Sequence, residues 1–148
     1  MSSQIFSRFY SKRALLSYAL ESLLILTLCK IIVICIPFKY WSAKCGKFQC
    51  ETLRDNVLAY QQTIVNIQRS VKWGARHVPW SSKCLDRALT VQWMLARRKL
   101  SSTIYFGMTK NNTKEWLAHA WVRCGDQWMI GYQPKANYTI VGTYALIF

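Results

Sequence analysis

The sequence is short of acidic residues and of histidine, and this limits its catalytic chemistry. Of its 148 residues only 6 are Asp or Glu and 2 are His, against 20 Lys and Arg. The list of possible catalysts is therefore short. Internal repeats and low-complexity segments are also missing, and 52% hydrophobic with 14% aromatic residues excludes a disordered polypeptide. The length suits one compact domain with a real core.

The charge balance is strongly positive, yet no tract resembles a nucleic-acid-binding arm. The formal net charge is +14, with small basic clusters at Arg97–Lys99 and between Lys39 and Lys47. Such an excess favours acidic peptides, anionic membrane surfaces or nucleic acid as neighbours. Aromatic residues are spread through apolar segments rather than interleaved with a basic patch, so nucleic-acid binding is the weakest of these hypotheses.

The six cysteines lack the setting of a secreted disulfide framework. Cys29 and Cys35 lie inside an apolar run, and Cys45 and Cys50 have no histidine nearby that would complete a zinc site. No small-residue cleavage site follows the apolar run, so we predict no signal peptide. These observations favour a reducing, cytoplasmic setting and a protein without a metal or other cofactor.

An apolar segment from Ser11 to Pro37 admits two interpretations. It approaches the roughly 20 residues that a membrane span needs. Lys30 interrupts it, however, and Glu21 stands at its edge. A central lysine costs about 2.5–3.5 kcal/mol on insertion scales. Two interpretations therefore stay open. The segment is either a helix that packs on the domain or lies on the inner face of a membrane, or it is a true transmembrane span.

Downstream, the apolar spacing predicts helices first and strands afterwards. Spacings of three and four residues predict a helix over Cys50–Trp73 and another over Lys83–Lys99, with Ser81 or Ser82 as its N-cap.

Strands are expected at Thr103–Met108, Leu117–Arg123 and Gln127–Tyr132, with a hairpin turn at 124–126 and a docked tail from Tyr138. The expected fold class is α+β, N-terminal helices followed by an antiparallel sheet. We divide the chain into an N-terminal helix and connector, 1–49, and a domain, 50–148.

Cys84 and His119 are the candidate catalytic pair. In the first turn of a helix, Cys84 faces unsatisfied N–H groups and the positive end of the helix dipole. Such a position, with Lys83 beside it, favours the thiolate. His119 opens an apolar strand and would act as the base. The alternative is a buried structural cysteine.

Two neighbours of this pair have weaker roles. Trp80 precedes the Cys84 helix and would wall the site or donate its indole N–H to substrate, or else pack in the core. His77, the other histidine, is expected to have a surface or capping role.

The sequence around both candidates resembles the transglutaminase-like cysteine peptidases of lasso-peptide maturation. The similar stretches are 71–85, 95–98 and Ala118-His119-Ala120-Trp121-Val122. Ile36-Pro37-Phe38, Ile130-Gly131 and Tyr138-Thr139 are also similar, so the resemblance covers nearly the whole chain. It implies a transglutaminase- or papain-like core with the nucleophile at a helix N-terminus. It also implies a peptidase that removes the leader from a ribosomally made precursor peptide, with Cys84 as nucleophile and His119 as base.

This sequence departs from the family pattern at the third catalytic residue. Those enzymes use a Cys-His-Asp triad, but the match places Gly131 at the aspartate position, and no Asp or Glu follows Asp126. In a hairpin turning at 125–126, Asp126 would lie about 20 Å from His119. We therefore expect Gln133 to orient the imidazole through its amide oxygen, unless a dyad works alone.

The resemblance also implies partners. The chain before Cys50 shows no strand-rich module that could hold a leader. A separate leader-recognition protein would then present the precursor peptide, and a lasso cyclase would act afterwards. The competing hypothesis is a non-catalytic, membrane-associated peptide-binding or scaffold protein on the same fold.

Overall fold

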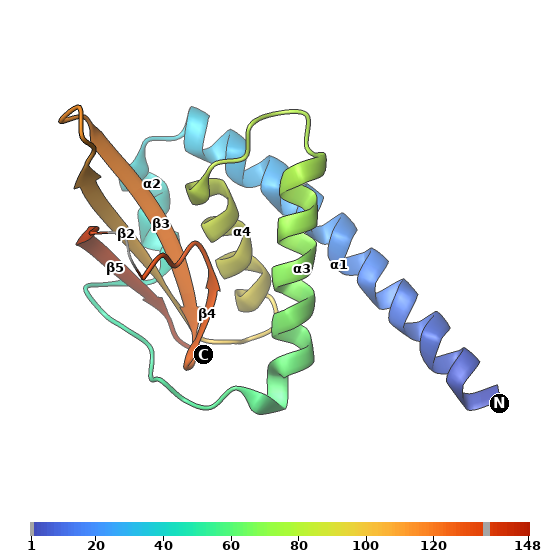
Figure 1. Ribbon diagram of the computed structural model, residues 1–148. Coiled ribbons are helices and arrows are strands. Elements are labelled where there is room, and N and C mark those ends of the chain that lie inside the picture. The colour runs from blue at the N-terminus through green and yellow to red at the C-terminus, as the bar shows by residue number, and fades with distance from the viewer. Residues whose placement is uncertain (1, 135–136) are drawn as a thin grey trace.

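The computed structural model describes residues 2–134 and 137–148, and it forms an antiparallel sheet covered by helices on one face (Figure 1). The helices are α1 (Ser2–Cys35), α2 (Phe38–Trp41), α3 (Gln61–His77) and α4 (Cys84–Ala96), with short 3-10 turns η1 (Ser42–Cys45) and η2 (Leu58–Tyr60). The strands are β1 (Lys47–Phe48), β2 (Ser102–Lys110), β3 (Trp116–Cys124), β4 (Gln127–Ile130) and β5 (Thr139–Leu146).

The five strands lie in the order β1-β5-β2-β3-β4 and every neighbouring pair is antiparallel. The three predicted strands are present, although β4 ends at Ile130 rather than Tyr132, and the turn at Gly125-Asp126 is confirmed. The docked tail is β5, which lies between β1 and β2 inside the sheet. The fold class is α+β, as expected.

α4 packs against β2 and β3, and α1 crosses over α3 and α4 on the side away from the sheet (Figure 1). One core cluster fills the space between these layers, with Ile64 and Ile67 from α3, Val91 and Met94 from α4, and Val122 from β3. The N-terminal end of α1 projects beyond this body.

The helix expected at Cys50–Trp73 is wrong at both ends, since α3 runs from Gln61 to His77. Residues 50–57 form no helix: the Thr52 N–H bonds to Thr103 Oγ1 at 2.8 Å instead of to a helix carbonyl, and Leu53 is 76% exposed. Gly74 does not break α3. It is buried inside the helix, where an added Cβ would lie 2.9 Å from Ser22 Oγ of α1.

Candidate active site

Cys84 is the first residue of α4, and the turn that carries it is capped by a carboxylate. The Asp86 carboxylate accepts the Lys83 backbone N–H at 2.9 Å. The N-cap is therefore Lys83, and the expectation of Ser81 or Ser82 is wrong. The predicted C-terminal end of this helix is also wrong, because α4 ends at Ala96 rather than Lys99. A negative charge in the first turn is favourable against the positive end of the helix dipole.

Lys30 of α1 holds the same turn from the other side. Its Nζ lies 3.3 Å from Asp86 Oδ2 and 3.3 Å from the Ser81 carbonyl oxygen. The Asp86 side chain is 2% exposed, so this lysine neutralises a buried carboxylate. The charge that interrupted the apolar segment is thus part of the packing between α1 and α4.

His119 lies on β3, and its ring orientation is fixed by the backbone. Its Nε2 lies 2.5 Å from the Gly131 carbonyl oxygen. A carbonyl only accepts hydrogen bonds, so Nε2 carries the proton and Nδ1 is left as the basic nitrogen. The ring also stacks with Tyr138 at 5.0 Å and with Trp121 at 5.9 Å between centroids.

The Cys84 thiol lies beside β3, next to the position that His119 occupies on that strand. Cys84 Sγ lies 3.9 Å from the carbonyl oxygen of Ala118, the residue before His119. The β3–β4 pairing ends at Val122 and Ile130, so β4 does not cover this part of β3.

No hydrogen bond joins the Cys84 thiol to the imidazole in the part of the chain that the structure describes. Ala120 and Val122 point into the helix-side core, so strand alternation places His119 on the opposite face. The thiol therefore contacts β3 from the helix side, whereas the His119 ring lies on the other face of the sheet.

The contact that we expected from Gln133 is made by Gly131. Gln133 is exposed and lines the same cavity as His119, but it makes no described hydrogen bond to the ring. Gly131 has φ +81°, and a Cβ there would lie 2.5 Å from the Ala120 carbonyl oxygen. Asp126 lies at the hairpin turn, where its N–H bonds to the Asp55 carbonyl at 3.0 Å.

His77 is the last residue of α3, and Trp80 lies between α3 and Cys84. Trp80 is half-buried, and its indole Nε1 is buried without a hydrogen-bond partner in the described chain. An unpaired buried donor is uncommon and costly. His77 Nδ1 lies 2.7 Å from the Trp73 carbonyl in the last turn of α3, which fits the expected capping role.

A family model described as the transglutaminase-like superfamily matches residues 32–143, well over half of the chain. The chain belongs to the transglutaminase-like superfamily. This superfamily includes cysteine peptidases and transglutaminases. A search of the curated proteins found no match, and a search of the solved structures found none either.

Three other thiols of this transglutaminase-like protein are unsuited to nucleophilic attack. Burial raises the pKa of Cys29 and of Cys45 to about 12, and that of Cys124 to about 11. These side chains stay protonated at neutral pH, whereas attack requires the thiolate. Cys84 is only half-buried and lies at a helix N-terminus.

A cavity of about 260 Å³ opens beside the imidazole, with walls that are mainly aromatic. Trp128 and Tyr132 stack there with centroids 4.0 Å apart and rings nearly parallel, and Arg54 lies 6.0 Å from the Trp128 ring. Flat aromatic walls suit a peptide that has apolar side chains, and the lining also includes one cation, Arg54, and one carboxylate, Glu51.

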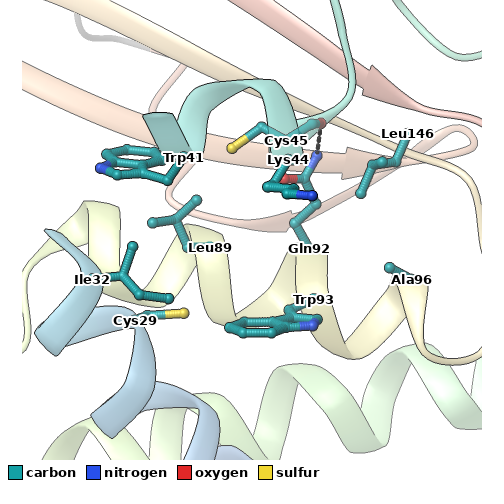
Figure 2. Close-up of a pocket in the computed structure, with 10 residues that line it drawn as sticks. All are labelled: Cys29, Ile32, Trp41, Lys44, Cys45, Leu89, Gln92, Trp93, Ala96 and Leu146. Carbon is teal, nitrogen blue, oxygen red and sulfur yellow. Dashed lines mark hydrogen bonds between the residues drawn. The ribbon is translucent and has the colours of Figure 1, made fainter. Parts of the chain in front are cut away.

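A second cavity, of about 460 Å³, lies away from both candidate residues (Figure 2). Its lining is mostly apolar and comes from α1, the Trp41–Cys45 turns and α4. Gln92 extends across it and donates a hydrogen bond to the Cys45 carbonyl oxygen at 2.9 Å.

The sequence reasoning missed a buried network on the His119 face of the sheet. Arg123 is fully buried, and its guanidinium bonds to Glu51 Oε2 at 3.1 Å and to the Tyr105 hydroxyl at 3.0 Å. Hydrogen bonds from Tyr105 and Arg123 outweigh the effect of partial burial and lower the pKa of Glu51. This network ties the segment after β1 to the sheet beside the aromatic cavity.

Within the described residues, no three His, Cys, Asp or Glu side chains gather as a metal site would require.

Proposed function

We propose that this protein is a cysteine peptidase that removes the leader from a ribosomally made precursor peptide during lasso-peptide maturation. The observation that carries the proposal is that the Cys84 thiol, at a helix N-terminus, lies 3.9 Å from the carbonyl oxygen of Ala118, the residue before the backbone-oriented His119. Membership of a superfamily that contains cysteine peptidases supports it. The lasso-peptide assignment rests on the sequence resemblance.

In the proposed mechanism His119 Nδ1 takes the Cys84 proton as Sγ attacks the scissile carbonyl carbon. The resulting oxyanion is stabilised by N–H groups at the start of α4, where Cys84 is the first residue. The tetrahedral intermediate expels the amine, which receives the proton from the imidazolium. A thioester remains on Cys84, and water that His119 deprotonates hydrolyses it and restores the thiol.

The carbonyl of Gly131 has the positioning role in this scheme. It holds Nε2–H and leaves Nδ1 as the base, as the side-chain amide does in papain-like enzymes. Gln133 and the aromatic cavity lie on the same side and are placed to contact the peptide.

The proposed partners follow from the resemblance and the charge. A separate leader-recognition protein delivers the precursor, and a lasso cyclase uses the product. We place the reaction in the cytoplasm, where the strongly basic surface meets an acidic peptide.

The decisive experiment incubates the protein with a precursor peptide from a neighbouring gene and its recognition protein. The Cys84→Ala variant should lose cleavage by a factor on the order of 10⁴ or more. A matched variant, Cys50→Ala, removes another half-buried thiol and should retain wild-type activity. Full activity of Cys84→Ala would disprove the mechanism.

One observation favours a second candidate, a non-catalytic peptide-binding scaffold. Gly131 stands where an orienting carboxylate is expected, and no hydrogen bond joins thiol and ring in the described chain. A scaffold would bind the precursor without cleaving it, and Cys84 would react with iodoacetamide no faster than a model thiol.

A further inference from the structure

The outward face of α1 is a continuous apolar surface that no part of the described chain covers. Its side chains recur every three or four residues and are largely exposed: Leu16 60%, Leu20 59%, Leu24 62%, Leu28 40%, Ile31 52% and Ile34 69%. Side chains at this spacing form one stripe along a helix. At 1.5 Å per residue, the stripe is about 27 Å long.

Both charged residues within this part of α1 point the other way. Glu21 bonds to Arg98 at 2.6 Å and to Arg97 at 2.9 Å, while Lys30 pairs with Asp86 at 3.3 Å. Burial alone would raise the pKa of Glu21, but the two arginines outweigh it and lower that pKa. Between residues 14 and 36 the outward face therefore carries no charged side chain.

The inward face of α1 is fastened to the domain along the same length. Ile25, Leu26 and Cys29 are buried, and Ser22 Oγ donates to the Ser70 carbonyl at 2.9 Å. A transmembrane span needs roughly 20 apolar residues free to face lipid. Insertion would separate Lys30 from Asp86 and leave each charge unpaired. The packing thus opposes a span and leaves one face of α1 to contact a partner.

We propose that α1 lies in the plane of an anionic membrane, with its outward face among the acyl chains and the domain still packed on its inward face. Exposed basic residues flank the stripe at both ends, namely Lys12 and Arg13 before it and Lys39, Lys44 and Lys47 after it. A charge-free apolar face bracketed by cations combines the two attractions that hold an interfacial helix on anionic lipid. The net charge of +14 acts in the same direction.

Lipid fits this surface better than a second copy of the chain does. Helix pairs in water usually carry complementary charges beside the apolar seam. Here the flanking charges are all basic, so two copies that met through this face would repel each other.

Vesicle flotation of the full-length protein tests the proposal. We expect binding to vesicles of phosphatidylcholine with phosphatidylglycerol, and much weaker binding to phosphatidylcholine alone or in 1 M salt. The Leu24→Glu variant should reduce partitioning about tenfold or more, because it removes a leucine from lipid and adds an anion. The matched variant Leu53→Glu changes a leucine that is 76% exposed on a loop and should bind like the wild type.

Circular dichroism melts of both variants report whether the fold is kept, and light scattering reports the oligomeric state. Three results would overturn the proposal. The protein does not bind anionic vesicles, or its binding is unaffected by both Leu20→Glu and Leu24→Glu, or it forms a dimer that Leu24→Glu dissociates and does not bind vesicles. Because the assay needs no substrate, it is independent of the proposed peptidase activity.

Discussion

At the scale of single residues, a backbone carbonyl takes the orienting position that a carboxylate occupies in related triads. The Gly131 oxygen receives the His119 Nε2–H, and the positive φ of Gly131 places it there. A carbonyl fixes the ring tautomer but brings no negative charge to stabilise the imidazolium. This position therefore supplies orientation without electrostatic assistance.

Gly131→Ala should lower kcat more than Gln133→Ala does. The added Cβ would clash with the Ala120 carbonyl, and alanine resists the left-handed backbone at a cost of about 1–2 kcal/mol. We expect a loss of kcat on the order of tenfold or more for Gly131→Ala. Gln133→Ala should change KM more than kcat, because its exposed side chain lines the cavity without contacting the ring. Steady-state kinetics separates the two, and a larger kcat loss for Gln133→Ala would return the orienting role to that residue.

The buried thiols make the folded protein sensitive to alkaline pH. The folded-state pKa of Cys29 and Cys45 is about 12, against an ordinary value of 9.0. Below pH 9 both states keep the proton, whereas between pH 9 and 12 only the unfolded state loses it. Stability should therefore fall by up to about 1.4 kcal/mol per pH unit and per thiol in this window.

Urea unfolding at pH 8 and pH 10.5 measures this loss. A Cys29→Ala, Cys45→Ala double variant should show a shallower decline than the wild type, while Cys35→Ala, an exposed control, should not. An equal pH slope in all three proteins would contradict the assignment.

At the scale of elements, the sequence predicted which segments are helices and strands better than it predicted where each begins and ends. The three strands and the hairpin were found because alternation and a Gly-Asp turn are local signals. The helix start at Gln61 was missed because residues 50–57 follow helical spacing but are bonded to the sheet through Thr103 and the Glu51–Arg123 pair. Such contacts join residues 50 or more positions apart, and no local pattern records them.

The candidate site divides in the same way. Cys84 and His119 are candidates because of their neighbours in the sequence, and the structure places Cys84 Sγ 3.9 Å from the carbonyl oxygen of Ala118, the residue before His119. The orienting Gly131 carbonyl was not recognisable, because backbone atoms carry no residue-type signal. Asp86 could have been identified as the capping residue, since an acidic residue three positions after the N-cap is a known pattern.

The ion pair between α1 and α4 should contribute measurably to stability. Lys30→Met leaves the Asp86 carboxylate buried without its ammonium partner and should lower the free energy of unfolding by about 1–3 kcal/mol. Chemical denaturation of Lys30→Met, Asp86→Asn and the double variant forms a cycle that isolates the pair. Strict additivity in that cycle would show that the two groups do not interact.

At the scale of the whole molecule, the charge excess should govern how the substrate arrives. With a net charge of +14, association with the acidic precursor that we propose should be faster at low salt and slower at high salt, where the charges are screened. We expect kcat/KM to fall about tenfold or more between 50 mM and 500 mM NaCl, with kcat nearly constant. A neutralised precursor, with its acidic residues replaced by amides, is the control and should show little salt dependence.

The contact of Lys30 with Asp86 also links two distant events. Asp86 caps the turn that presents Cys84, and its cation comes from the helix whose other face is exposed. Because one carboxylate makes both contacts, a change at Lys30 reaches the turn that carries Cys84. The rate at which a small alkylating agent modifies Cys84 should therefore differ between the wild type and Lys30→Met, and this can be measured without substrate or partner.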